Sequence, residues 1–319
     1  MGVPWVESYE GTAYHPNIEA DLERQQNIAK EFEHIIVLAS FLAGDRLSLA
    51  SYAHGETGVK ERPGIWADLD FNEPQVIKSY LNYCRDLIAR FQPDYFGYVA
   101  EVDSAFTDIN DNRFSKLREL AKTIYTTLKN EYPDLIIFAE FNLGDRPYMK
   151  ERSEVISALL PYSDIYALST YPARFEKIAG DASKLSDNWF TLARRYAADK
   201  PIAVLETGFH AEHFMHPKLG VKVSDHDQRL LIPGGQKSQA LYTKQLLEAA
   251  HQMNMPFINL WTVHDLDALF ALLEKNDPET RTSMLRLAMD MGLYDQDGKP
   301  RPSLDIWDAW LSLPLQTDI

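Results

Sequence analysis

The most constraining feature of this sequence is a repeated alternation of short apolar runs with longer amphipathic segments, which begins at residue 34. The apolar runs with the length of buried strands are residues 34–42, 93–103, 135–142, 164–172, 201–209 and 256–265. Segments with apolar residues at helical spacing lie between them, at about 74–91, 114–132, 151–161, 185–198 and 236–254. This order is typical of successive βα units that build a parallel sheet.

The pattern predicts an α/β protein with a (β/α)8 TIM barrel. An open doubly wound sheet is less suitable, because no Gly-rich turn of the dinucleotide-binding type follows any strand. Two barrel strands are missing from the pattern. Residues 17–33 predict a helix, and residues 3–16 resemble a strand end or a loop, so the first βα unit is either lacking or irregular. Without any linker-like segment, residues 1–319 are predicted to form a single domain that ends in a turn at 296–298 and a closing helix.

Composition limits the partners of the chain. A formal charge of −15 argues against binding to nucleic acid or to an anionic membrane, because phosphate groups are bound mainly by Lys and Arg. No apolar run approaches the roughly 20 residues of a membrane span, and no secretory leader is recognisable. We therefore expect a soluble protein, either cytoplasmic or secreted with its signal absent from this chain. Cys84 is the single cysteine and is expected to be a buried thiol. No cofactor is predicted, and the oligomeric state is left open.

Three predicted strands end in side chains that can perform chemistry: Glu101 after YVA, Glu206 after AVL and Trp261 after INL. Glu140 in FAEFN and Tyr171 in STYP occupy two further strand ends. Active sites of barrels lie at the carboxyl ends of the strands. Two carboxylates about 5 Å apart can hydrolyse a glycoside, one as the nucleophile and the other as the acid and then the base. For any one of these carboxylates, the alternative is a salt bridge within the barrel.

On these motifs, residues 34–311 resemble the retaining (β/α)8 glycoside hydrolases of clan A. Those enzymes carry the acid/base Glu at the end of strand 4 and the nucleophile Glu at the end of strand 7. The resemblance thus implies that Glu101 in YVAEVD is the acid/base and Glu206 in AVLETGF the nucleophile. It also implies that Tyr171 in ALSTYP hydrogen-bonds the nucleophile and that Trp261 in NLWTVHD lies under the sugar. STYP and ETGF are similar to the endo-galactanase branch as well.

The sequence departs from this family in two places. The family carries Asn before the acid/base Glu, where it binds the sugar 2-hydroxyl, and this chain has Ala100. Asp103, Glu140 and Asn142 are the candidates to replace that contact. The Arg that the family has on an early strand is not located. The other residues predicted to contact a carbohydrate substrate are His210 and His264.

Two other functions remain open at this level. The first is a carbohydrate-binding barrel without catalysis, which Ala100 and the irregular first unit would explain. The second is a metal-dependent barrel hydrolase that uses the cluster His210, Glu212, His213 and His216. A substrate-binding or solvated loop is the preferred interpretation of that cluster, so no metal is predicted. Residues 108–113 approach a calcium-loop spacing but are better interpreted as a helix N-cap.

Overall fold

The computed structural model describes residues 2–55, 59–175, 177–216, 221–222, 230–276, 286 and 288–314. The chain divides into two compact units. The N-terminal unit comprises Met1–Asn142, Lys150–Leu168 and Tyr196–Pro201, and the C-terminal unit comprises Leu143–Met149, Ser169–Arg195 and Ile202–Ile319. Within the described part of the chain, no helix has both the length and the apolar character needed to cross a membrane.

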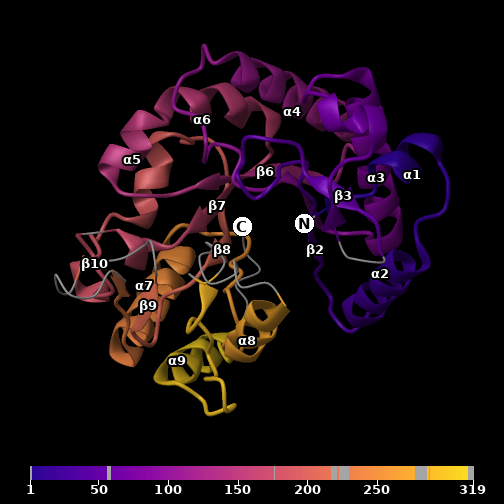
Figure 1. Cartoon of the computed structure of the whole chain (residues 1–319). Coiled ribbons are helices and arrows are strands. Elements are labelled where there is room, and N and C mark those ends of the chain that lie inside the picture. The colour runs from indigo at the N-terminus through magenta and orange to yellow at the C-terminus, as the bar shows by residue number, and fades with distance from the viewer. Residues whose placement is uncertain are drawn as a thin grey trace. The chain divides into compact units, whose positions relative to one another are not determined.

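The central element is a sheet of five strands in the order β2-β5-β6-β7-β8, which matches their order in the sequence (Figure 1). The strands are β2 (Ile36–Leu38), β5 (Tyr95–Val99), β6 (Ile136–Asn142), β7 (Tyr166–Thr170) and β8 (Ile202–Thr207). β2 pairs in parallel with β5, and β5 pairs in parallel with β6. The fold is therefore α/β, as predicted, but the described residues do not form a complete eight-stranded barrel.

In the N-terminal unit, amphipathic helices cover the strands on their outer side (Figure 1). The helices are α1 (Trp5–Glu10), α2 (Pro16–Ala29), α3 (Pro74–Phe91), α4 (Asn112–Glu131) and α6 (Ser153–Leu159), with 3-10 turns at Gly64–Asp68 and Leu160–Tyr162. The predicted helix at 74–91 is confirmed. Pro74 begins α3 and Gln92 ends it in a left-handed conformation. Cys84 is fully buried on its inner face, and burial raises the pKa of the thiol.

The start of the chain differs from the prediction. Residues 3–16 contain helix α1, which ends at Gly11 in the left-handed conformation. Trp5 is fully buried and donates its indole N–H to the carbonyl of Ala50 at 2.8 Å, a contact that sequence spacing does not reveal. β1 (Gly2–Val3), β3 (Ser51–Ala53) and β4 (Val59–Lys60) form a separate three-stranded sheet. The segment before β2 is thus not a first barrel strand.

Gly97 in β5 is required by close packing against both neighbouring strands. A Cβ atom at this position would lie 2.6 Å from Cδ1 of Leu38 and 2.9 Å from the ring of Phe138. We expect Gly97→Ala to lower the free energy of unfolding by about 1–3 kcal/mol, because the side chains of Leu38 and Phe138 must move. The measurement is urea unfolding followed by circular dichroism. Gly44→Ala is the matched control, because a Cβ there meets nothing within 4 Å. Equal stability losses in the two variants would contradict the packing argument.

The C-terminal unit contains a long helix, α7 (Gln236–Gln252), which packs against the closing helix α9 (Pro302–Leu311). The turn at 296–298 and the closing helix confirm the prediction for this end. The other elements are α8 (Asp267–Asn276), α5 (Arg146–Glu151), which crosses the boundary between the units, and the antiparallel sheet of β9 (Phe214–His216), β10 (Val221–Lys222) and β11 (Leu230–Ile232).

Two predicted elements are wrong in this unit. The segment 185–198 is not a helix but contains a 3-10 helix at Phe190–Arg195, preceded by another at Ala182–Lys184. Trp189 is buried here and donates its indole N–H to Oγ1 of Thr170 at 3.1 Å. The Thr191 hydroxyl donates to the carbonyl of Asn188, and such local side-chain bonds compete with a helix. Long-range anchoring and local competition together explain the irregular backbone.

The predicted strand at 256–265 is the second error. It meets β8 through an isolated parallel bridge between Val204 and Ile258. The side-chain amide of Asn259 donates to the carbonyl of Leu205 at 3.0 Å. In a regular strand pair, that carbonyl would accept from a backbone N–H group instead. Backbone bonds still hold the segment against β8, among them one from Trp261 N to Thr207 O at 2.7 Å. The apolar run therefore lies beside β8 without forming a regular strand.

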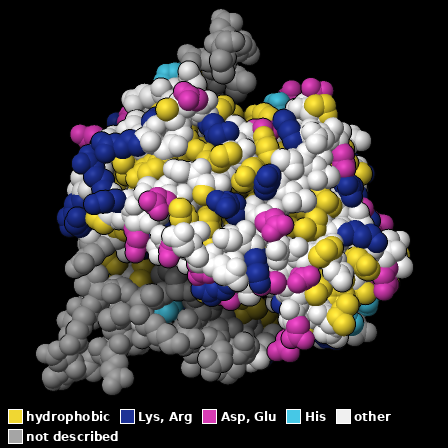
Figure 2. Space-filling model, turned by 90° about the horizontal axis from the view of Figure 1, so that it is seen from above, with side chains coloured by type: hydrophobic (Ala, Val, Ile, Leu, Met, Phe, Trp, Pro, Cys, Tyr) yellow, Lys and Arg dark blue, Asp and Glu magenta, His cyan; other side chains and the backbone are white. Residues whose placement is uncertain are grey.

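The surface of the described residues is mixed in character. On the face shown in Figure 2, acidic side chains are scattered among basic and apolar ones. The excess of Asp and Glu in the sequence is thus not gathered into one patch on this face.

Candidate active site

Glu101 lies just beyond the carboxyl end of β5 in the N-terminal unit. Its backbone has φ +45°, an uncommon conformation for a residue other than glycine. Backbone bonds secure the turn on both sides, from Val102 N to Glu140 O at 2.9 Å and from Ser104 N to Glu101 O at 3.1 Å. The turn changes the direction of the chain directly after Ala100, which is 3% exposed. Strained backbone of this kind clusters at functional sites, where the surrounding structure maintains it.

Arg46 binds Glu101 and was not identified from the sequence. Its Nη2 and Nε donate to Oε2 of Glu101 at 2.9 and 3.2 Å, and the two side chains are 24% and 18% exposed. Arg46 also has a positive φ, +57°, in a turn where the Asp45 carboxylate accepts from the backbone N–H groups of Leu47 and Ser48. The turn sequence Ala43-Gly44-Asp45-Arg46 is the signal that could have revealed it. Both members of this ion pair are therefore held by unusual backbone.

Asp103 and Asn142 hold the Glu101 loop onto the end of β6. Oδ1 of Asp103 accepts from the backbone and the side-chain amide of Asn142, at 2.8 and 3.2 Å. The two residues are 0% and 2% exposed, and Glu140 is fully buried as well. Burial raises the pKa of Asp103 from 3.8 to about 6, against the lowering effect of the Asn142 bonds and with a smaller increase from the charge of Glu101. Contact of these three residues with a substrate stays a prediction.

The raised pKa of Asp103 leads to a pH-dependent stability. The folded state binds this proton more tightly than the unfolded state, so the contribution of Asp103 to stability is fully present below pH 3.8 and is lost as the pH rises through about 6. The whole loss amounts to about 3 kcal/mol, of which about 2 kcal/mol falls between pH 4 and pH 6. Asp103→Asn keeps an acceptor at Oδ1 and removes the titration. We expect its stability relative to the parent protein to increase from pH 4 to pH 6 and then to level off.

Urea unfolding at several pH values measures this difference. Asp103→Ala is the companion variant, because it removes both the titration and the acceptor for Asn142. It should follow the pH dependence of Asp103→Asn at a lower stability throughout. Parallel stability profiles for the parent protein and Asp103→Asn would contradict the assignment.

Glu206 is the penultimate residue of β8 in the C-terminal unit, and its side chain is half-buried. The phenol of Tyr171 donates a hydrogen bond to Oε2 of Glu206 at 3.2 Å. Tyr171 follows the last residue of β7 and begins the 3-10 turn Pro172–Arg174. The predicted hydrogen bond between the end of one strand and a carboxylate of the next is therefore present.

The residues around Glu206 hold this end of β8 rigidly. The hydroxyl of Thr207 donates to the carbonyl of Thr170 at 2.6 Å and also contacts the hydroxyl of Tyr242. At Gly208, a Cβ atom would lie 2.5 Å from the carbonyl oxygen of Trp261, so the glycine of the ETGF motif permits a close approach of two chain segments. Trp261 is 37% exposed, so a large part of its ring is open to a ligand.

The remaining predicted residues of this unit fall into two groups. His210 is 1% exposed, and its carbonyl accepts from the backbone N–H of Gly235. His264 is exposed and stacks on Tyr294, with 4.9 Å between the ring centroids and 22° between the planes. His264 is therefore an exposed aromatic residue, whereas His210 lies inside the unit.

The predicted alternative of a metal site at His210, Glu212, His213 and His216 gains no support. Nδ1 of His213 accepts from the backbone N–H of Gly234, and Glu212 forms an ion pair with Arg301. The described side chains that are grouped closely enough to hold a metal are three others, Asp265, Asp267 and Asp290. The preferred interpretation of residues 108–113 as a helix N-cap is confirmed, because Asp111 caps α4 by accepting from the backbone N–H of Arg113.

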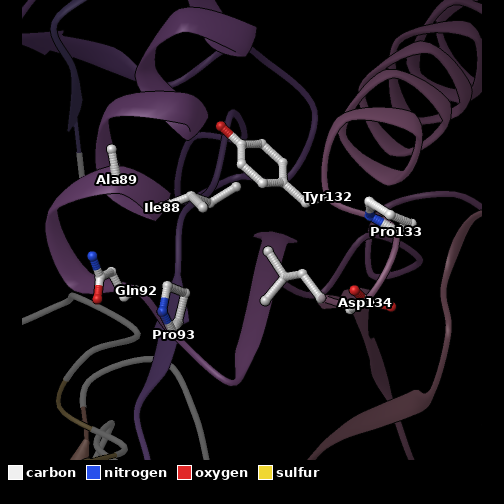
Figure 3. A pocket seen from close by; sticks show the side chains of 8 residues that line it. Ile88, Ala89, Gln92, Pro93, Tyr132, Pro133 and Asp134 are labelled. Atoms are coloured by element: carbon white, nitrogen blue, oxygen red, sulfur yellow. The ribbon is translucent and has the colours of Figure 1, made fainter.

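A hollow of the N-terminal unit lies away from Glu101. It has a volume of about 480 Å³ and is lined by the ends of α3 and α4 and by the residues that lead into β5 and β6. Figure 3 shows Ile88, Pro93 and Tyr132 around it. Ile88 and Pro93 precede β5 and Tyr132 precedes β6, whereas Glu101 follows β5. The hollow is thus at the opposite end of the strand from the candidate active site.

No protein-family model matches the chain, and a search of curated proteins also finds no match. Solved structures do match. The β-D-glucuronidase of Dictyoglomus thermophilum has a TM-score of 0.52 and 16% identity, with 93% of this chain and 48% of that chain covered. The GH53 catalytic domain of Ignisphaera aggregans has a TM-score of 0.56 and 17% identity, with 90% and 77% covered. This chain therefore spans about half the length of the glucuronidase. At these identities, the likeness is one of fold.

Proposed function

We propose that this protein is a retaining glycoside hydrolase that cleaves a β-linked neutral oligo- or polysaccharide, with Glu206 as the nucleophile and Glu101 as the acid/base. The observation that carries the proposal is the hydrogen bond from Tyr171 to Glu206 at the carboxyl end of β8. It is supported by the fold, which is similar to those of a β-glucuronidase and a GH53 catalytic domain. The strongly acidic chain also suits an uncharged substrate better than an anionic one.

In the first step, a carboxylate oxygen of Glu206 forms a bond to the anomeric carbon while the bond to the leaving oxygen breaks. Glu101 gives its proton to that oxygen. The Tyr171 phenol orients the nucleophile through its hydrogen bond to Oε2 of Glu206. Both Arg46 donors bind Oε2 of Glu101 and hold this carboxyl group in place.

In the second step, water replaces the leaving group. Glu101, now a carboxylate, removes a proton from the water as it attacks the anomeric carbon and releases Glu206. Arg46 forms an ion pair with this carboxylate and orients it toward the water. The exposed ring of Trp261 offers an apolar surface to the C–H face of the sugar. Retention of the anomeric configuration follows from two successive inversions.

The experiment is a panel of 4-nitrophenyl β-glycosides, namely glucoside, galactoside, mannoside, xyloside and glucuronide. Release of nitrophenol from a neutral glycoside, with the β-anomer formed first in the NMR spectrum, is the expected result. A 2-deoxy-2-fluoro analogue of the active glycoside should label Glu206, as shown by peptide mass spectrometry. If the panel shows no turnover while neutral oligosaccharides raise the melting temperature, the protein binds sugars without cleaving them. Formation of the α-anomer first would contradict the retaining mechanism.

A further inference from the structure

Three carboxylates of the C-terminal unit lie together without a role in the proposed mechanism. Asp265, Asp267 and Asp290 each place an oxygen atom within 4.8 Å of the others. They come from two separate segments. Asp265 and Asp267 follow Trp261 and lead into α8, and Asp290 precedes the residues that pair with the Trp261 segment. The close approach of three negative groups calls for compensating positive charge.

The positive charge described beside this cluster is that of Arg301, and two carboxylates already share it. Arg301 is 1% exposed at its side chain, and its Nη1 and Nη2 donate to Oδ1 and Oδ2 of Asp265 at 2.6 Å each. Its Nη2 also donates to Oε1 of Glu212 at 2.7 Å. One guanidinium thus faces two bound carboxylates, and Asp267 and Asp290 add two more negative groups beside them. Among the described side chains, the cluster carries more negative than positive charge.

Asp290 is the second observation that points to a ligand. The residue is 6% exposed, and its carboxylate makes no hydrogen bond or ion pair with any of the residues described for this chain. Its carboxylate nevertheless points at the oxygens of Asp265 and Asp267. Oδ2 of Asp267 is buried and also lacks a hydrogen-bond partner in the described structure. A buried carboxylate in such surroundings is costly unless a cation compensates it.

We propose that Asp265, Asp267 and Asp290 bind one divalent cation, with a preference for Ca²⁺. Carboxylate oxygens are hard ligands, and the three side chains include no nitrogen or sulfur that would favour Zn²⁺. Calcium binds oxygen at about 2.3–2.6 Å, so its ligand atoms can be up to about 5 Å apart. The corresponding limit for Mg²⁺ is about 4.2 Å, given its bond length of about 2.1 Å. A spacing of within 4.8 Å lies inside the range that calcium can bridge.

The cation would join two segments that already lie side by side, one of which follows Trp261. Leu293 N donates to Thr262 O at 3.3 Å, and Asp265 N donates to Tyr294 O at 3.1 Å. Asp290 is anchored on its other side, where its carbonyl accepts from Ala211 N at 2.7 Å. A calcium ion here would fix the segment that carries Trp261 and His264. Its binding is independent of the proposed function, because no substrate takes part.

The test uses the full chain after treatment with EDTA and dialysis. Isothermal titration with CaCl2 should show one site, with a dissociation constant on the order of 10⁻⁴ M or tighter. A hundredfold excess over that constant should raise the melting temperature by about 4 °C. Asp290→Asn and Asp267→Asn should each weaken binding at least about tenfold, with near-ultraviolet circular dichroism confirming that they fold. Asp308→Asn, which removes an exposed carboxylate of α9, should bind calcium as the parent protein does.

Several outcomes would overturn the proposal. The parent protein could show neither heat nor a change in melting temperature up to 5 mM CaCl2. Binding could also persist unchanged in both Asp290→Asn and Asp267→Asn, which would place the ion elsewhere. An equal response to MgCl2 would refute the preference for calcium.

Discussion

Replacing Glu206 by Ala is expected to lower kcat on an activated aryl β-glycoside by at least about 10⁴-fold, because the covalent step loses its nucleophile. The short side chain leaves space beside the phenol of Tyr171, which is 3.2 Å from Oε2 of Glu206 in the parent protein. Added azide should fill that space and restore part of the rate by attacking the anomeric carbon directly. The product is then the α-glycosyl azide, since a single displacement inverts the configuration. Nitrophenol release and product NMR measure both effects.

The contrast with Glu101→Ala separates the two carboxylates. An aryl leaving group needs little help from an acid, so this variant should retain the first step and be slow in the second, by roughly 10²–10⁴-fold. Azide should then replace water on the covalent intermediate and give the β-glycosyl azide. Glu248→Ala, an exchange on α7 outside the site, is the control and should keep the parent activity. Activity of Glu206→Ala close to that of the control would exclude Glu206 as the nucleophile.

Replacing Arg301 by Met is expected to lower the free energy of unfolding by about 3–5 kcal/mol, because it leaves the charge of Asp265 buried without its partner. The side chains of Arg301 and Asp265 are 1% and 2% exposed. Arg301 also donates to the carbonyl of Gly292, so the exchange removes a backbone contact as well. Urea unfolding in the presence of EDTA measures the effect without any contribution from bound cations.

Arg24→Met is the matched control for this prediction. Arg24 also pairs with a carboxylate, at 2.6 Å from Asp21, but its side chain is 63% exposed. Exposed pairs of this kind contribute about 0–1 kcal/mol. A loss for Arg301→Met no larger than that for Arg24→Met would show that Arg301 is not needed to compensate the cluster.

The helices of the N-terminal unit were predictable because the spacing of their apolar residues and the residue types at their ends both indicate a helix over the same range. α3 is predicted from Pro74 at its first position and from buried residues at helical spacing such as Tyr80, Cys84 and Leu87. The two wrong elements share another cause. Trp189 and Asn259 are held by hydrogen bonds to Thr170 and Leu205, which lie 19 and 54 positions away in the chain. Periodicity within a segment does not contain such distant partners.

The candidate site shows the same division. Glu206 and Tyr171 were identified from the sequence, because each is a polar residue at the end of an apolar run. A polar side chain at such a position suggests a functional role. Their hydrogen bond agrees with the prediction. Arg46 was not identified from the sequence, because its partner Glu101 is 55 positions away in the chain. Both residues also have positive φ values in turns. Asp290 was not identified either, since its burial beside Asp265 and Asp267 depends on contacts between two separate segments of the chain.

The sequence by itself determined the α/β class, the order of its strands and the carboxylates at their ends, because these depend on patterns within ten or twenty residues. Only the tertiary structure decided which charges meet. Arg46 with Glu101, Arg301 with Asp265, and Asp290 with its two acidic neighbours are brought together by packing over long stretches of chain. Electrostatic energy depends on distance and burial, and both are properties of the folded chain.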